Sequence, residues 1–132
     1  MKRTALALAA SAAFAGFAVP AHAQISGDTI KIGLITDLSG VYSDVDGNGG
    51  AEAVRMAIAD LGGAVNGKKI EFMVADHQNK PDIAASKARE WFDQQGVDMV
   101  IGGTNSGANL AMAKVAARRR KSLFRSAPAV PS

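Results

Sequence analysis

Residues 97–107 read Val-Asp-Met-Val-Ile-Gly-Gly-Thr-Asn-Ser-Gly. This pattern predicts a short apolar strand that runs into glycines and small polar residues, followed by an Ala-rich helix. Gly102 and Gly103 let a ligand come close to the backbone, and Asn105 or Ser106 can cap the helix. The first N–H groups of a helix are unpaired and partly positive, so this turn can receive a carboxylate. The alternative is an ordinary strand-to-helix turn.

The residues before this turn repeat the alternation of strand and helix. Runs of β-branched and apolar residues predict strands, and apolar residues at helical spacing predict helices. The expected strands are residues 30–36, 69–75 and 97–101, and the expected helices are residues 50–61, about 81–95 and 107–117. The faces expected to be buried comprise Val54, Ala57, Ile58 and Leu61 in the first helix, and Ala84, Ala88, Trp91 and Phe92 in the second. This alternation predicts an α/β fold with a parallel sheet flanked by helices.

Polar segments follow each of the three predicted strands. They are residues 36–44, 75–79 and 102–107. In a parallel sheet a ligand binds beyond the carboxyl ends of the strands, so we expect these segments to meet at one edge and form a binding site. Tyr42, in the first segment, can contact a ligand there or pack on the helix below it.

Other kinds of site lack the residues they need. No Gly-x-Gly-x-x-Gly follows the first predicted strand, and no Gly-x-x-x-x-Gly-Lys-Ser/Thr phosphate loop occurs. Residues 44–49 imitate the start of a calcium loop, but Arg55 stands where the bidentate Glu is needed. Asp76 and His77 have no second His, Cys or activated nucleophile with them, and we expect the pair to order its loop. The sequence therefore predicts no catalytic residue, no metal and no cofactor.

The first 23 residues have the features of a secretory signal peptide. Lys2 and Arg3 precede an apolar run at residues 5–19, and Ala-His-Ala at residues 21–23 is a typical cleavage site. The apolar run is too short for a comfortable membrane span. We expect a mature chain that begins at Gln24 in the periplasm, with a fold that needs no disulfide because the chain has no Cys.

The positive net charge of +3 is unevenly distributed. Residues 24–117 contain eight Lys and Arg against twelve Asp and Glu, a net charge of −4. The excess of basic residues lies in the signal peptide and in residues 118–125. Because the predicted folded part has no basic stripe with interleaved aromatic residues, we expect no nucleic-acid partner.

Six segments of the chain, in order, resemble the solute-binding proteins of ABC transporters of the branched-chain amino acid type. They are Ile32-Gly33-Leu34 and residues 37–44, 52–57, 75–82, 88–93 and 100–106. The similarity covers about residues 28–117. Members of this family have two lobes that close on a ligand. The resemblance therefore implies that this chain forms the Rossmann-like N-terminal lobe of a type I periplasmic binding protein.

The resemblance also implies site residues, a ligand and a partner. Asn105 and Ser106, with the backbone of Gly103 and Thr104, would face a ligand carboxylate, and Tyr42 would line the cleft. The ligand would be a small carboxylate such as a branched-chain amino acid. The Asp-His-Gln-Asn sequence at residues 76–79 is similar to members associated with varied carboxylates, including aromatic acids. The partner would be an inner-membrane ABC permease, and the protein a monomer.

The sequence departs from the family after residue 117. The family continues with a fourth strand, a ligand loop rich in Gly, Ser and Thr, and a second lobe, whereas residues 118–121 here are Arg-Arg-Arg-Lys. We expect an incomplete lobe at residues 24–117, truncated or frameshifted, and an aberrant basic tail at residues 118–132. The tail has three interpretations: an interaction segment, a solvated helix end, or a slipped reading frame. Residues 119–131 can be back-translated so that another reading frame encodes Lys-Lys-Lys-Val-Pro-Phe-Pro-Phe-Gly-Thr-Gly-Ser-Ser. The family would have such a sequence at this place.

Three functional hypotheses follow. The first is a periplasmic solute-binding component of an ABC importer, without catalysis. The second is an extracytoplasmic ligand-sensing module that reports to a signalling receptor. The third is an exported enzyme that uses Asp76 and His77. The resemblance favours the first.

Overall fold

The computed structural model describes residue 25 and residues 27–125. The expected signal peptide, the expected start at Gln24 and the end of the expected tail lie outside the described residues. In chain order the elements are β1 (Thr29–Thr36), the π-helix η1 (Ser43–Gly47), α1 (Asn48–Asp60), β2 (Ala64–Val65), β3 (Lys68–Asp76), α2 (Pro81–Gln94), β4 (Met99–Gly102), α3 (Ser106–Arg119) and β5 (Ser122–Arg125). All three predicted helices and all three predicted strands are present, within a few residues of the expected bounds.

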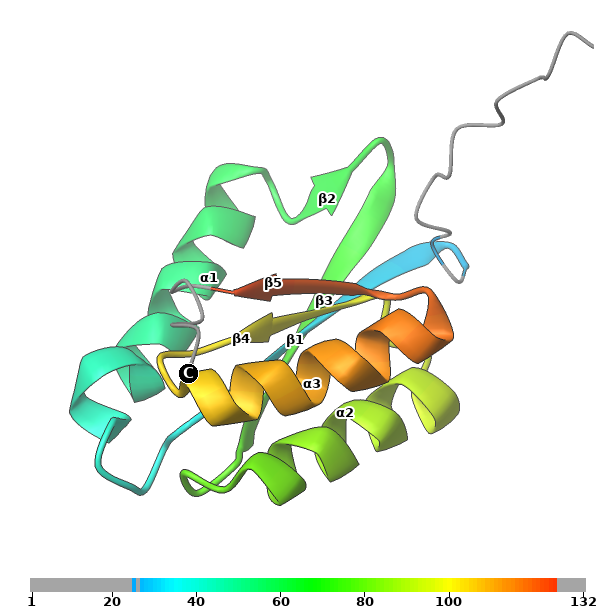
Figure 1. The fold of residues 1–132 in the computed structure, drawn as a ribbon. Coiled ribbons are helices and arrows are strands. Elements are labelled where there is room, and N and C mark those ends of the chain that lie inside the picture. Colours follow the sequence, from blue (N-terminus) through cyan, green and yellow to red (C-terminus); the bar gives the residue numbers. More distant parts are fainter. Residues whose placement is uncertain (1–24, 26, 126–132) are drawn as a thin grey trace, which may run out of the picture.

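The five strands form one sheet in the order β2-β3-β1-β4-β5 (Figure 1). β1 is parallel to β3 and β4, and β4 is parallel to β5. The parallel sheet is therefore confirmed, and a short antiparallel strand is added at one edge. The two-residue strand β2 pairs antiparallel to β3 through a hairpin turn at Asn66 and Gly67. Their φ angles of 50° and 77° are the positive values that such a tight turn requires.

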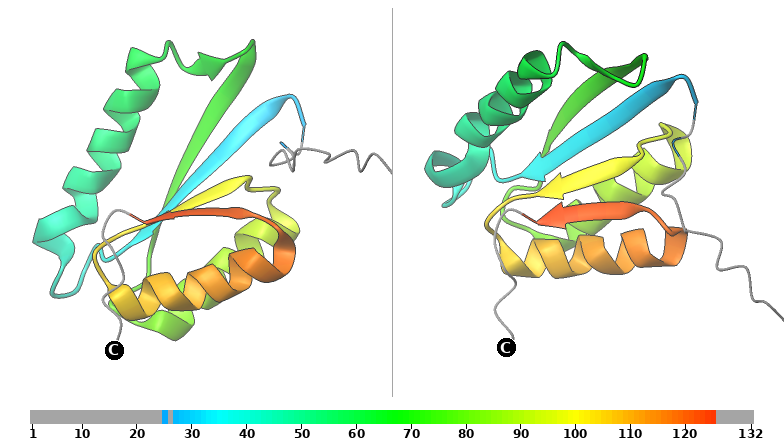
Figure 2. Two further views of the ribbon diagram at one scale, coloured as in Figure 1. Left: turned by 45° about the horizontal axis from the view of Figure 1, so that its top comes forward. Right: turned by 90° about the horizontal axis from the view of Figure 1, so that it is seen from above.

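Helices cover both faces of the sheet, α1 on one and α2 with α3 on the other (Figure 2). The hydrophobic core lies between the sheet and the α2–α3 pair. It is formed by Ile35, Ala84, Ala85, Ala88, Trp91, Phe92, Val97, Val100, Ala108, Met112, Val115 and Ala116. The buried face predicted for the second helix is confirmed, because its four residues are all at most 8% exposed.

The α1 face is covered less well than the sequence predicts. Of the four residues expected on the buried side, Leu61 is 62% exposed, Ala57 is also exposed, and Val54 and Ile58 are half-buried, whereas Ala51 is buried. Between α1 and strands β4 and β5 lies a largely apolar cavity of about 250 Å³, with Val54 and the 60% exposed Phe124 in its lining. Amphipathic spacing identifies the helix but not how much of its apolar face the sheet beneath it covers.

The structure corrects the expectation that the sheet-forming pattern stops at residue 117. Helix α3 continues to Arg119, and Arg120 ends it in the left-handed conformation with φ of 53°. Residues 122–125 then pair in parallel with β4 as strand β5, and Leu123 packs against the core. The basic run at residues 118–121 is thus followed by a strand of the sheet, whose Leu123 packs against the core.

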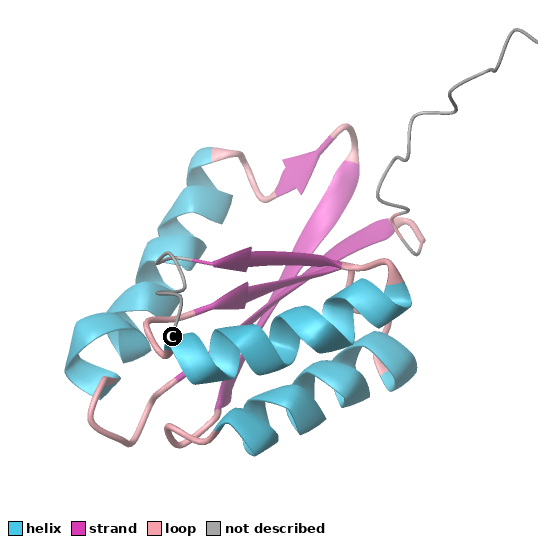
Figure 3. Ribbon diagram, in the orientation of Figure 1, coloured by secondary structure: helices cyan, strands magenta, loops and turns pink. Residues whose placement is uncertain are grey.

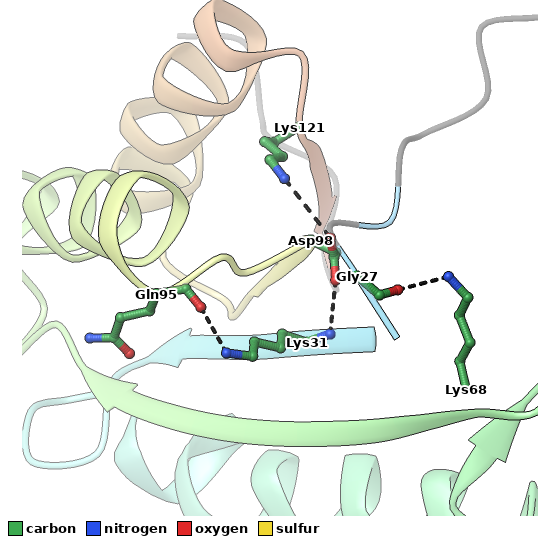
Figure 4. Close-up of polar contacts among 6 residues, drawn as sticks. All are labelled: Gly27, Lys31, Lys68, Gln95, Asp98 and Lys121. Carbon is green, nitrogen blue, oxygen red and sulfur yellow. Dashed lines mark hydrogen bonds and ion pairs between the residues drawn. The ribbon is translucent and has the colours of Figure 1, made fainter. Parts of the chain in front are cut away.

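Polar contacts tie strands together at the amino-terminal edge of the sheet (Figure 4). The backbone N–H of Lys31 donates to Asp98 Oδ2 at 2.9 Å, and its ammonium donates to the carbonyl of Gln95 at 3.1 Å. The Lys121 ammonium lies 3.9 Å from Asp98 Oδ1. Asp98 thus links the start of β1 to the residue that precedes β5. Among residues 27–125, no helix is long and apolar enough to cross a membrane.

Candidate functional site

The loops that follow β1, β3 and β4 come together at the carboxyl-terminal edge of the sheet (Figure 3). The strand register places them level, because Thr36 is paired with Asp76 and Ile35 with Gly102. The sequence prediction that three polar segments meet at one edge is therefore confirmed. Side chains from each loop then bind the backbone or side chains of a neighbouring loop.

Asp76 ties the loop after β3 to the loop after β1. Its Oδ1 accepts hydrogen bonds from the backbone N–H of Leu38 at 3.0 Å and of Gln78 at 2.7 Å, and its Oδ2 accepts from the Ser39 hydroxyl at 2.6 Å. Burial acts to raise the pKa of Asp76, but the hydrogen bonds from Ser39, Leu38 and Gln78 act against it, and the pKa is lowered. A carboxylate that is held ionised by three donors serves to order the loops.

Asn105 is the residue that caps helix α3. Its side-chain Oδ1 accepts a hydrogen bond from the backbone N–H of Ala108 at 2.8 Å, and its amide donates to Asn79 Oδ1 in the loop after β3. The sequence alone does not decide between Asn105 and Ser106 as the capping residue. The Ser106 hydroxyl and the N–H groups of Ser106 and Gly107 have no partner among residues 27–125. They are the donors that remain available at the start of the helix.

Asp46 reaches into the same corner from η1. One carboxylate oxygen accepts a hydrogen bond from the Thr36 hydroxyl at 3.1 Å, and the other accepts from the backbone N–H of Thr104. Gly103 lies directly against this carboxylate, and a Cβ there would overlap with both Asp46 and Thr36. Glycine is needed at position 103 for this close approach.

Tyr42 lies on the loop after β1, and its side chain is exposed to solvent. The residue is 38% exposed, and its ring hydroxyl makes no hydrogen bond to the described residues. Its backbone N–H donates to Asp37 Oδ2 at 3.0 Å. The residues Gly103, Thr104, Asn105 and Ser106 form the turn that leads into α3, and the exposed Tyr42 ring remains a predicted contact for a ligand.

His77 is 1% exposed, and its contacts require a neutral ring. Its Nδ1 accepts a hydrogen bond from the backbone N–H of Asn79 at 3.0 Å, so the ring proton is assigned to Nε2. Burial lowers the pKa of His77, and the carboxylates of Asp37, Asp76 and Asp46 oppose this shift only in part. A neutral, buried acceptor orders the loop after β3, as the sequence predicts.

We expect the stability of the chain to fall as the pH drops below about 6.5. Because the pKa of His77 is lowered in the folded state, the unfolded state takes up a proton at a higher pH than the folded state does. The free energy of unfolding is therefore larger above about pH 6.5 and decreases as the pH falls below it. Urea unfolding followed by the fluorescence of Trp91 at pH 7.5 and 5.5 measures the change. His77→Gln should be less stable overall and lose this pH dependence. An equal dependence in the variant would contradict the assignment.

Sequence reasoning missed two carboxylates of this edge, the buried Asp37 and the half-buried Asp46. Asp37 is 1% exposed and accepts hydrogen bonds from the N–H groups of Gly40 at 2.7 Å and Tyr42 at 3.0 Å. The spacing Asp-x-x-Gly is a turn signal that could have identified it. For Asp46 no local signal exists, because its partner Thr104 lies 58 residues away in the chain.

Within the described ranges, no three His, Cys, Asp or Glu side chains gather closely enough to hold a metal ion. Residues 44–49, which resemble the start of a calcium loop in sequence, do not form a loop around a cation position, because they belong to η1 and the first turn of α1. What the edge offers instead is a set of backbone and hydroxyl donors beside a helix start.

Comparison with known proteins gives matches that agree with one another. A family model described as periplasmic binding protein matches residues 29–131. A periplasmic binding protein from Burkholderia mallei is 60% identical, with a TM-score of 0.73 over 74% of this chain and 26% of that one. A branched-chain amino acid ABC transporter ligand-binding protein from Burkholderia xenovorans is 41% identical, with a TM-score of 0.72 over 77% and 27%.

A third solved structure carries a ligand. It is the solute-binding protein of an ABC transporter from Rhodopseudomonas palustris in complex with 3,4-dihydroxybenzoic acid, 30% identical, with a TM-score of 0.68 over 75% of this chain and 27% of that one. The chain thus spans about a quarter of the length of these structures. No curated protein sequence matches it significantly.

Proposed function

The chain belongs to the periplasmic binding protein family, and on that premise we propose that it supplies one side of a cleft for a small carboxylate imported by an ABC transporter. The family consists of solute-binding proteins and not of enzymes. The ligand is a branched-chain amino acid or an aromatic acid, the two chemistries that the names of the similar proteins carry. The match to transporter proteins favours an importer over a signalling receptor.

One observation carries the proposal. At the edge where three loops meet, the Ser106 hydroxyl and the N–H groups of Ser106 and Gly107 have no partner within residues 27–125. Unpaired donors at a helix start favour an anion, and a carboxylate accepts two or three such bonds at once. Asn105 holds the turn in place by capping the helix.

The remaining parts of the proposal concern location and partners. Residues 1–23 act as a signal peptide, so that the mature chain begins at Gln24 in the periplasm. The loaded protein is a monomer that delivers its ligand to an inner-membrane permease. Neither ligand binding nor delivery to the permease needs a cofactor.

We expect binding to depend on Ser106 and to be weak. The described residues enclose a ligand from one side, so millimolar affinity is expected. Titration of the ¹⁵N-labelled chain with isoleucine and with 3,4-dihydroxybenzoate should shift the amide signals of residues 103–107. Because Ser106 does not cap α3, Ser106→Ala should fold normally and bind about tenfold or more weakly, the loss of one hydrogen bond to a charged group.

Ser86→Ala is the matched control, because Ser86 is an exposed residue of α2 away from the strand ends. It should bind like the parent chain. Shifts that cluster outside residues 103–107, or equal binding by Ser106→Ala and the parent chain, would show that the ligand does not bind at this turn.

A further inference from the structure

The carboxylate of Asp46 occupies part of the corner that the proposed ligand would use. It comes from η1 and binds the Thr36 hydroxyl at the end of β1 and the backbone N–H of Thr104 in the loop after β4. Thr104 belongs to the turn that would face the ligand carboxylate. One of the donors of that turn is therefore already paired with a carboxylate of the chain itself.

The surroundings of Asp46 are acidic. No Lys or Arg within the described residues forms an ion pair with it, and the buried carboxylate of Asp37 and that of Asp76 lie at the same edge. Burial lowers the pKa of His77 although all three carboxylates act to raise it, and its Nδ1 accepts a hydrogen bond from the Asn79 N–H, so the ring adds no positive charge. A ligand carboxylate that approaches this corner therefore meets negative charge as well as the free donors of Ser106 and Gly107.

Gly103 shows how closely Asp46 fits. A side chain at this position would overlap with the Asp46 carboxylate and the Thr36 hydroxyl. The backbone N–H of Asp46 is also held, by the carbonyl of Tyr42 at 3.3 Å. The carboxylate thus sits in a fitted position and does not hang freely from the surface.

We propose that Asp46 is an internal competitor for the ligand carboxylate, so that it sets the affinity of the site for anions. The inference rests on the proposed function. A ligand gains the Thr104 N–H by displacing the Asp46 carboxylate, and the segment 43–47 moves away from the corner when it does so. Without the competing carboxylate, the same donors bind an external carboxylate more tightly.

The test compares Asp46→Ala and Asp46→Asn with the matched variant Asp44→Ala. Asp44 is an exposed acidic residue of the same π-helix, and its side chain makes no hydrogen bond to the described residues. Asp46→Ala frees the Thr104 N–H, whereas Asp46→Asn removes the charge and keeps an acceptor of the same shape. Hydrogen exchange of the Thr104 amide, measured without ligand, should be about tenfold faster in Asp46→Ala and unchanged in Asp44→Ala.

Affinity for 3,4-dihydroxybenzoate, measured by amide shifts, completes the test. We expect about tenfold tighter binding by Asp46→Ala, a smaller gain in Asp46→Asn, and parent-like binding by Asp44→Ala, as loss of one charge-assisted competing bond predicts. Equal or weaker binding by both Asp46 variants, or an unchanged Thr104 amide, would overturn the competitor role while leaving the site itself standing. A responsive Thr104 amide with no binding by any variant would overturn the proposed function, and the competitor role with it.

Discussion

We expect Trp91→Ala to lower the free energy of unfolding by about 3–5 kcal/mol, since the indole is one of the largest groups in the core. Trp91 is 4% exposed on the buried face of α2 and packs over β1 at Gly33. A domain of this size has a total stability of only about 5–15 kcal/mol, so the variant should be close to unfolded at 37 °C. Urea unfolding must be followed by far-UV circular dichroism, because Trp91 is the one tryptophan of the chain.

A double-mutant cycle with Gly33 tests the same contact from the other side. A Cβ at Gly33 would overlap with the six-membered ring of Trp91, so Gly33→Ala alone should cost about 1–3 kcal/mol. In the Trp91→Ala background the added methyl group enters the vacated space, and the cost should shrink or change sign. Gln94→Ala, an exposed change on the same helix, should be nearly neutral. Additive costs in the cycle would show that ring and glycine are not in contact.

Asp37→Ala is expected to cost about 3 kcal/mol, the second largest effect. The side chain is buried and accepts hydrogen bonds from the N–H groups of Gly40 and Tyr42 at 2.7 and 3.0 Å. Each bond to a charged acceptor contributes about 1.5–3 kcal/mol, and removal leaves two backbone donors unpaired. Hydrogen exchange should report a local loss of protection at residues 40–47 together with the lower midpoint in urea.

The control for Asp37 is Asp44→Ala, which removes a carboxylate from the same segment at an exposed position. It should change stability by at most about 0.5 kcal/mol. If the two variants were equally stable, the loop after β1 would be held by its packing and not by the buried carboxylate.

The fold could be predicted from local patterns with good accuracy. Val, Ile and Leu runs mark β1, β3 and β4, and the Pro81-Asp82 start marks α2 because proline fits the first turn of a helix. The four apolar residues of α2 are all buried, as their spacing predicts. Strand β5 could not be predicted, because it has only four residues and only Leu123 among them packs against the core, which leaves almost no periodic signal. The Arg-rich run that precedes it is also untypical of a strand.

The sequence by itself determined the alternation of strands and helices, the buried side of α2, and the edge of the sheet at which the polar loops meet. These follow from spacing along the chain, which sets the direction of side chains within one element. Only the tertiary structure decided that Asn105 caps α3, that Leu61 stays exposed, and that Asp46 binds Thr104. The physical reason is that capping between two adjacent candidates depends on backbone geometry, exposure depends on what lies beneath a helix, and a contact across 58 residues depends on the packing of the whole sheet.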